Sequence, residues 1–284
     1  MGNLAGLGLF GIYTFDFEDQ PVSLVRESIQ ELEELGFRAC WFPEVGGREA
    51  FTHAGLLLAS TSTMHVVNAI AQIGGREPRG TQGASALLAE AYPDRHVLGL
   101  GFGAARPGVK PLAAVGEYLD ALDAFDGPRI RRILAAYGPK MLELARDRSA
   151  GAHTYHVNVA HTAAAREILG EAFLGVEHAV VLETDADTAR AIARAHLAPR
   201  YLDPASTFNL AKFRRLGYTE DDISGGGSDR LVDDLVFWGD LDTIVAKLRN
   251  HVEAGADHVA VQVLGIEPGT SALPQWRQLA QALV

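Results

Sequence analysis

Glu44 is a candidate for acid–base chemistry because of its position in the chain. It directly follows an apolar run that ends at Pro43, and Arg48 stands four positions further on. A carboxylate at the end of a buried strand can act as a general acid or base, or can orient a substrate. An ordinary loop carboxylate paired with Arg48 is the alternative, and the spacing alone leaves both interpretations open.

Glycines alternate with apolar residues between positions 98 and 103. Gly99, Gly101 and Gly103 lack the side chain that would keep a neighbouring backbone or a flat ring away. Their spacing does not match the GxGxxG fingerprint of dinucleotide-binding proteins, and we expect no helix to begin there. Phe102 lies within the same run. Tight packing between strands is the alternative explanation for these glycines.

Tyr137 ends another apolar run and is followed by a pattern that starts helices. Gly138 precedes Pro139, and proline is favoured at the first helical position. The free backbone N–H groups of such a helix end attract anions together with the helix dipole, and Lys140 adds a positive charge. The pattern therefore predicts a phosphate site, with an ordinary helix start as the alternative.

The histidines and the single cysteine do not form a recognisable metal or thiol site. His153, His156 and His161 lack the helical spacing of metal ligands, and the chain contains neither HExxH nor CxxC. Cys40 lies inside a predicted strand, which argues against a thiol nucleophile. His156 lies close to a strand end and could face a substrate, although a buried or solvated histidine is the commoner case. We expect no bound metal.

Composition and charge narrow the class of protein. The 284 residues are 48% hydrophobic and 21% charged, as in an ordinary globular domain, and the net charge is −11. Nucleic-acid binding needs clustered basic residues, and the tightest cluster here (Arg129, Arg131 and Arg132) precedes an apolar strand. No apolar run approaches the ~20 residues that cross a bilayer. We expect a cytoplasmic protein with a small-molecule substrate and without nucleic-acid or membrane partners; a homodimer stays open.

Apolar runs typical of buried strands alternate with amphipathic helical stretches along the chain. The predicted strands span residues 7–13, 37–43, 65–73, 96–102, 132–137, 152–157, 178–183 and 258–264. The predicted helices span residues 22–35, 50–62, 81–92, 112–125, 139–148, 162–169, 188–197, 208–216, 231–238, 241–254 and 275–283. Residues 199–227 break the rhythm and end in three consecutive glycines.

Eight predicted strands, most of them followed by a helix, match the size and rhythm of a closed (β/α)8 barrel, the TIM barrel. Continuous apolar runs favour parallel strands buried on both faces. An open doubly wound sheet is the alternative. We predict one domain over residues 1–284. A barrel of this kind carries its active site at the carboxyl ends of the strands. One rim should therefore hold Glu44, Ala69, Gly101, Tyr137 and His156.

At these strand ends the chain resembles the bacterial luciferase-like monooxygenase superfamily, and most of all its actinobacterial branch of F420-dependent oxidoreductases. The matching stretches cover the chain from end to end in the family's order. They are ELEELGFRACWFPEVGGREAFTHAGLLLA, AEAYPDRHVLGLG, KPLAAVGEYLDALDA, AAYGPKMLELA, AVVLETDADTARAIARAHLAPRYL, GGGSDRLVDDLVFWGD and AGADHVAVQVL.

The resemblance implies a TIM barrel with an insertion after strand seven, which the irregular segment 199–227 would supply. It implies a flavin-type ring at the carboxyl ends of the strands, beside Gly101, Phe102 and Gly103. Members often have a non-prolyl cis peptide that supports the ring, and the matching pair in this chain is Ala69-Ile70. Such a bond costs roughly 3–4 kcal/mol, so surrounding packing must hold it.

The resemblance also assigns the coenzyme phosphate to the loop and helix start after strand five: Tyr137, Gly138, Pro139 and Lys140. In related deazaflavin dehydrogenases the second strand ends in a catalytic histidine, and Glu44 stands at that position. The resemblance therefore implies that Glu44 is the acid–base or substrate-orienting residue. Arg48 and His156 are further candidates for contact with the substrate.

Two features depart from the family's pattern. Gly74-Gly75 replaces an aromatic residue and an alanine, and the short loop after strand four has Ala104 where relatives carry a polar or acidic residue. Three hypotheses follow. The chain is a hydride-transferring oxidoreductase that uses coenzyme F420, or an FMN-dependent monooxygenase on the same fold, or a degenerate coenzyme-binding paralogue without activity. No residue distinguishes the two rings, and the resemblance favours F420.

Overall fold

Eight parallel strands close into a barrel in the part of the chain that the computed structural model describes, residues 4–103, 107–126, 130–267 and 269–284. β10 pairs with both β1 and β8, and this double pairing closes the sheet. The barrel strands are β1 (Phe10–Tyr13), β2 (Ala39–Phe42), β3 (His65–Asn68), β5 (His96–Gly101), β6 (Arg132–Ala135), β7 (Gly151–Thr154), β8 (Phe173–Val181) and β10 (His258–Val263). The predicted TIM barrel is confirmed.

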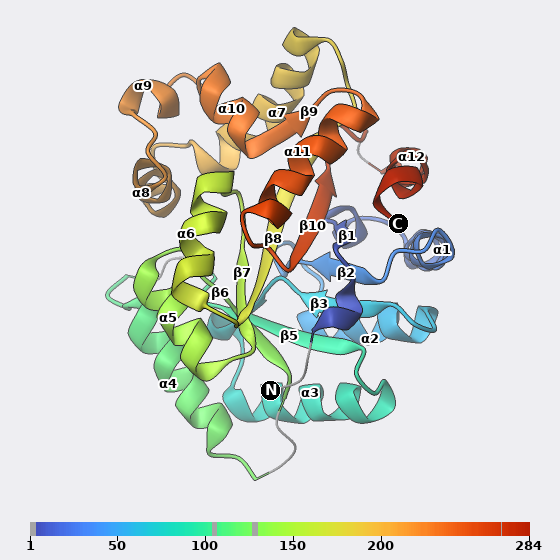
Figure 1. Ribbon diagram of the computed structural model, residues 1–284. Helices are drawn as coiled ribbons and strands as arrows, with labels where there is room; N and C mark the ends of the chain where they lie inside the picture. Colours follow the sequence, from blue (N-terminus) through green and yellow to red (C-terminus); the bar gives the residue numbers. More distant parts are fainter. Residues whose placement is uncertain (1–3, 104–106, 127–129, 268) are drawn as a thin grey trace.

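Helices cover the outside of the barrel (Figure 1). In α1, Val25, Ile29 and Leu32 recur at helical spacing and are buried, and the chain then turns at Gly36 with φ 101°. The helices are α1 (Val22–Glu34), α2 (Ala50–Ser60), α3 (Pro78–Ala91), α4 (Pro111–Asp123), α5 (Pro139–Arg148), α6 (Val159–Leu169), α7 (Ala186–Tyr201), α8 (Thr207–Arg215), α9 (Glu220–Ile223), α10 (Asp229–Leu235), α11 (Leu241–Glu253) and α12 (Leu273–Leu283). Among the residues described, no helix is both long and apolar enough to span a membrane.

The third strand is broken, whereas the sequence predicts one run over residues 65–73. β3 ends at Asn68, and a two-residue strand, β4 (Ala71–Gln72), then pairs with β5. The carbonyl of Ala69 leaves the ladder because it accepts a hydrogen bond from the Tyr13 hydroxyl at 2.9 Å. The Tyr13 side chain of β1 has therefore taken the place of a backbone N–H as the hydrogen-bond donor to this carbonyl.

A further strand, β9 (Val236–Trp238), occupies the end of the segment predicted as a helix over residues 231–238. It pairs with Ala179–Val181, the last residues of β8. Valine, phenylalanine and tryptophan all favour strands, and β8 extends beyond the end of β7 and so offers free backbone partners there. The helix prediction is wrong for these residues because an available strand edge outweighs local periodicity.

Side chains along each strand alternate between two layers. In β8, Val176 and Val180 pack into the apolar layer between strands and helices. Residues of the opposite parity point into the barrel, where Tyr13, Trp41 and Ile133 belong to an interior cluster. This alternation decides which strand residues reach the barrel mouth.

The segment between β8 and β9 builds a small core of its own over the carboxyl end of β8. Leu197 of α7, Phe213 of α8 and Leu231 of α10 are fully buried in it, beside Ala179 and Val181 of β8. Figure 1 shows α7, α9 and α10 together at the top of the view, toward which β10 points. The predicted insertion after strand seven is confirmed, and it lies against the mouth.

Candidate functional site

The carboxyl ends of the barrel strands bring the predicted rim residues to one face. Glu44, Ala69 and Gly101 stand at or just after the ends of β2, β3 and β5, and Tyr137 and His156 follow β6 and β7. Because all of these strands are parallel and the sheet is closed, these ends form one mouth.

Glu44 is held in an ion pair with Arg76, not with Arg48. Arg76 Nη1 donates to Glu44 Oε2 at 2.6 Å, and Nη2 contacts Oε1. The backbone N–H of Gln72 also donates to Oε2, at 2.8 Å. Arg76 reaches Glu49 at 2.9 Å as well, and its own side chain is 11% exposed. The Glu44 carboxylate therefore has a fixed orientation at the rim.

Arg48 is occupied elsewhere. Its backbone N–H donates to Glu18 Oε2 at 3.2 Å, and its guanidinium donates to the carbonyl of Gln20. The pairing of Glu44 with Arg48 that the spacing allowed is thus wrong. The partner in the structure lies 32 positions along the chain from Glu44, beyond the reach of local spacing.

The peptide between Ala69 and Ile70 is trans, as are all peptide bonds in the described ranges. The expected cis bond is wrong. The trans bond suits its surroundings: Ala69 N donates to the carbonyl of Phe42 at 2.7 Å, and the carbonyl of Ile70 accepts from Glu44 N at 3.2 Å. These two hydrogen bonds hold the trans peptide in place.

The alternating glycines of β5 are packed against the end of the third strand. A methyl group on Gly99 would overlap the carbonyl oxygen of Asn68, and one on Gly101 would overlap the side chain of Ile70. At Gly103, with φ 74°, it would overlap Gln72. The structure thus places the chain's own residues beside these glycines, as the tight-packing alternative requires.

Phe102 belongs to the same run, and Ala104 directly follows the run. Phe102 is partly buried and packs against the outer apolar layer. Ala104, predicted to mark a missing polar contact, falls in residues 104–106, outside the described residues.

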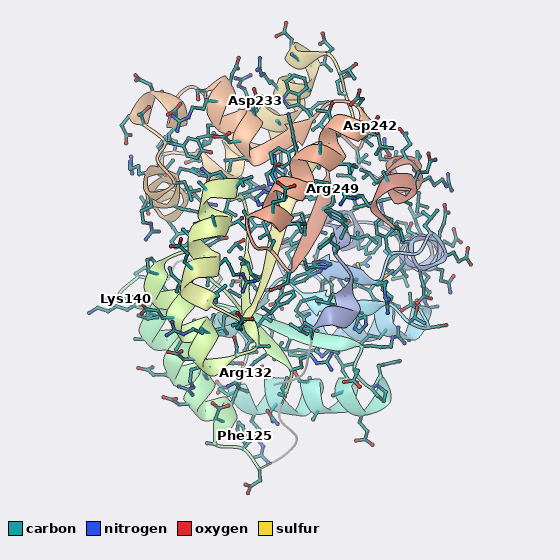
Figure 2. All side chains as sticks on the ribbon, in the orientation of Figure 1. Phe125, Arg132, Lys140, Asp233, Asp242 and Arg249 are labelled. Atoms are coloured by element: carbon teal, nitrogen blue, oxygen red, sulfur yellow. The ribbon has the colours of Figure 1, made fainter. Side chains whose placement is uncertain are left out.

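The start of α5 has the geometry of an anion site. Gly138 is its N-cap residue, Pro139 follows, and no side chain caps the helix. Lys140 is exposed and projects away from the barrel in Figure 2. Arg215 of α8 comes closer, because its Nη1 lies 3.7 Å from where a Cβ on Gly138 would stand. The insertion therefore supplies a cation at this helix start, and sequence reasoning did not predict it.

Four tyrosines converge on the mouth. The Tyr155 hydroxyl lies 3.0 Å from the Tyr201 hydroxyl and 3.2 Å from Gln262 Oε1. Burial raises the pKa of Tyr13 and of Tyr155 well above the ordinary value, and the nearby Glu177 adds to both effects. Burial raises the pKa of Tyr137 too. These phenols stay protonated, and the hydroxyls of Tyr13 and Tyr155 donate to the carbonyl of Ala69 and to Gln262 Oε1.

Glu177 and Lys212 are charged residue types buried beneath these tyrosines. Both side chains have almost no exposure. Burial raises the pKa of the Glu177 carboxyl to about 8, and burial lowers the pKa of the Lys212 ammonium to about 7. Lys212 Nζ donates to the carbonyl of Tyr155 at 3.2 Å and lies 4.9 Å from the centre of the Tyr137 ring.

His156 connects this buried pair to α7. Its backbone N–H donates to Glu177 Oε2 at 3.0 Å, and its Nε2 lies 3.1 Å from His196 Nε2. Its φ of 49° is left-handed, a conformation that L-residues other than glycine adopt infrequently. Burial lowers the pKa of His156 well below its ordinary value, so the ring is neutral. His156 was predicted near the mouth, and the structure places it there, fully buried.

Glu177, His196 and Lys212 were not predicted as site residues. The predicted seventh strand begins at His178, one residue after Glu177, whereas β8 begins at Phe173. A glutamate inside an otherwise apolar stretch, LGVEHAVV, was the available signal. Within the described ranges, no group of three or more His, Cys, Asp or Glu side chains is arranged to hold a metal.

Solved structures share the fold over nearly the whole chain. An F420-dependent secondary alcohol dehydrogenase, in complex with an F420–acetone adduct, has a TM-score of 0.75 at 13% identity and covers 97% of this chain and 98% of its own. The F420-dependent tetrahydromethanopterin reductase of Methanopyrus kandleri has a TM-score of 0.75 at 17% identity, with the same coverage.

An FMN-containing barrel is similar too. The oxygenating constituent of 3,6-diketocamphane monooxygenase from Pseudomonas putida, in complex with FMN, has a TM-score of 0.71 at 15% identity, over 97% of this chain and 96% of that one. At such identities the likeness establishes the fold alone. No curated protein matches the chain in sequence.

A sequence match covers the first part of the barrel. Residues 10–125, less than half of the chain, match the sequence model of the luciferase-like monooxygenase family. This segment runs from β1 through α4 and includes Glu44 and the end of the third strand. The chain is therefore similar to luciferase-like monooxygenases in the half of the barrel that carries its rim carboxylate.

Proposed function

We propose that the protein is an oxidoreductase of the luciferase-like type that uses coenzyme F420, in the actinobacterial branch that the sequence resembles. The match of residues 10–125 to the luciferase-like family carries this proposal, because it is a sequence signal independent of the fold. The F420-dependent barrels of similar architecture support it. We place the protein in the cytoplasm, as a single domain acting on a small organic substrate.

The residues present fit the phosphate end of such a coenzyme. The uncapped start of α5 offers free backbone N–H groups, and Arg215 lies close to Gly138. The two residues that would hold the phosphate by backbone are Gly138 and Lys140, since Pro139 has no N–H. The ring end is more confined, because Ile70 and Gln72 fill the space beside the β5 glycines. The coenzyme, when bound, supplies the hydride chemistry.

Glu44 acts in this proposal as an orienting group. Its carboxylate accepts two guanidinium hydrogen bonds and the backbone N–H groups of Gln72 and Ala50, which fix it at the rim. A carboxylate held in this way presents its oxygens to a substrate in a fixed orientation. Arg48 and His156 stay candidates for contact with the substrate, as the sequence suggested.

The confined ring end favours one alternative, a paralogue that has lost coenzyme binding. The FMN-containing barrel of similar fold favours the other, an FMN-dependent monooxygenase. A titration separates the three. Purified protein is titrated with F420 and with FMN while the fluorescence of each ring is followed.

We expect saturable binding of F420 at micromolar concentration and at least about tenfold weaker binding of FMN, a difference of about 1.4 kcal/mol. Tighter binding of FMN supports the monooxygenase alternative. Absence of binding of both rings at millimolar concentration overturns the enzyme proposal. A luciferase-like FMN enzyme run in parallel serves as the positive control for the fluorescence signal.

A further inference from the structure

Glu177 points into the barrel interior. It is in register with Ala260 of β10, which belongs to the interior cluster, and it alternates with Val176, which packs outward. Its side chain is fully buried, and its Oε1 has no hydrogen-bond partner among the described residues. A carboxyl oxygen in that state is available to a group that enters the mouth.

A continuous line of polar atoms runs from Glu177 toward the outside of the molecule. His156 Nδ1 lies 3.4 Å from Glu177 Oε2, so a small rotation of the ring brings it into hydrogen-bond distance. On the other side of the same ring, Nε2 lies 3.1 Å from His196 Nε2. His196 stands on α7 and is only partly buried. The line thus ends where solvent reaches it.

The backbone of His156 is arranged to keep its ring between the two partners. The left-handed φ of 49° is stabilised by the hydrogen bond from His156 N to Glu177 Oε2. Such a conformation is unfavourable for a residue with a Cβ, so contacts around it must hold it. Tyr201 packs edge-on against the ring at 4.5 Å between centroids.

We propose that Glu177, His156 and His196 form a proton relay that connects solvent beside α7 with the interior of the barrel mouth. The inference rests on the proposed function, since it supplies the proton that an oxidoreductase at this mouth exchanges with its substrate. The histidines serve as neutral carriers, and Glu177 is the group that gives or takes the proton inside.

The transfer balances without any other reactant. Glu177 donates its proton from Oε1 to a base in the mouth and becomes a carboxylate. Oε2 then takes the proton from His156 Nδ1, His156 Nε2 takes the proton from His196 Nε2, and water protonates His196 at Nδ1. One proton enters from solvent for the proton delivered, both histidines end neutral as the opposite tautomer, and no electrons move. Transfer of a proton in the reverse direction, from the mouth to solvent, restores both starting tautomers.

Titratable groups face the relay from several elements. Those around Glu177 and His156 come from β1, the loops after β6 and β7, α7, α8 and the outer face of β8: Tyr13, Tyr137, Tyr155, Tyr201, Lys212 and His178. Arg200 faces His196. Burial favours the protonated Glu177 acid, whereas the backbone N–H of His156 and the Lys212 charge favour the carboxylate. Burial is the larger effect, which leaves a proton on Glu177 at neutral pH.

The alternative is a purely structural role, in which Glu177 only accepts the N–H of His156. The rate at which Glu177 exchanges its proton distinguishes the structural role from the proton relay. A jump from pH 6 to pH 9 is applied to the protein without coenzyme, and the infrared band of the protonated Glu177 carboxyl is followed in time. Glu177→Gln removes this band and so assigns it.

We expect His196→Ala to slow the loss of the band by about tenfold or more, the scale on which positioned proton carriers act. Imidazole added to the buffer should restore the rate. His65→Gln, at the opposite end of the barrel, is the matched control and should leave the rate unchanged. An unchanged rate in His196→Ala, or a band that Glu177→Gln does not remove, overturns the relay.

These measurements need no coenzyme, so they distinguish failure of the relay from failure of the proposed function. If His196→Ala slows proton exchange but the protein binds neither F420 nor FMN, the relay is supported and the proposed function is wrong. If the protein binds coenzyme but His196→Ala does not slow proton exchange at Glu177, the oxidoreductase proposal is supported and this proton path is excluded. If His196→Ala melts at a lower temperature than the native chain, His196→Gln replaces it in the same comparison.

Discussion

At the scale of single residues, the cation expected to bind a phosphate at the start of α5 is decided by where its side chain lies. The sequence suggests Lys140 as the cation for a phosphate, yet its side chain projects into solvent (Figure 2). Arg215 approaches Gly138 from the insertion instead. A guanidinium also matches a phosphate by paired hydrogen bonds, which an ammonium does not.

Arg215→Glu should therefore weaken coenzyme binding by about tenfold or more, and Lys140→Glu by only about threefold. Dissociation constants at two salt concentrations check this, and both effects should shrink as salt rises because rim charges are screened. Lys110→Glu, just before α4, is the control and should change nothing. A larger loss in Lys140→Glu than in Arg215→Glu would place the phosphate contact on α5 alone.

At the scale of elements, β5 and the broken third strand are fitted to one another. Gly99 lets the carbonyl of Asn68 approach, and Gly101 makes room for Ile70. The break after β3 in turn lets Ala69 bind Tyr13 and lets Gln72 bind Glu44. The position of the rim carboxylate thus depends on glycines that do not touch it.

Gly99→Ala should lower the free energy of unfolding by about 2–4 kcal/mol, because backbone at Asn68 has to move. Gly83→Ala is the matched control, since a Cβ there meets nothing within 4 Å and lies inside α3. It should raise stability by roughly 0.5–1 kcal/mol, the helix preference of alanine over glycine. Urea unfolding monitored by circular dichroism measures both, and equal effects of the two substitutions would contradict the packing described for β5.

At the scale of the whole molecule, the barrel and the insertion enclose ionisable groups between them. Glu177 comes from a barrel strand and Lys212 from α8 of the insertion, and both side chains are buried. Enclosing such groups opposes folding unless they change protonation state. The folded protein therefore has a stability that depends on pH through this interface.

Glu177→Gln should raise the free energy of unfolding by an amount that grows with pH. The folded pKa of about 8 lies above the ordinary value of 4.5, so the unfolded chain loses this proton first as pH rises. Stability contributed by Glu177 is thus complete below pH 4.5 and is lost as pH rises toward about 8. The gain in the variant grows at up to ~1.4 kcal/mol for each pH unit in that window.

Denaturant unfolding at several pH values between 4 and 9 tests this, with Glu171→Gln as an exposed control. The control, at an exposed position, should lack the gain in stability that is expected for Glu177→Gln. A gain in Glu177→Gln that does not vary with pH would mean that this carboxyl titrates alike in the folded and unfolded chain.

The sequence by itself determined the architecture, because the buried positions of strands and helices are apolar and recur at a regular spacing along the chain. Apolar runs predicted the eight barrel strands, and the Gly138-Pro139 pair predicted the start of α5 at the residue where it begins. The rim positions of Glu44, Tyr137 and His156 followed from those strand ends.

Only the tertiary structure decided which side chains meet. Arg76 reaches Glu44, His196 reaches His156 and Arg215 reaches Gly138 across separations that no local pattern encodes. β9 likewise forms because β8 extends beyond the end of β7, and its last residues have free backbone groups with which β9 pairs. Barrel closure and strand register set these contacts, and both depend on the summed packing of the whole chain, whereas periodicity reports only whether each residue is buried.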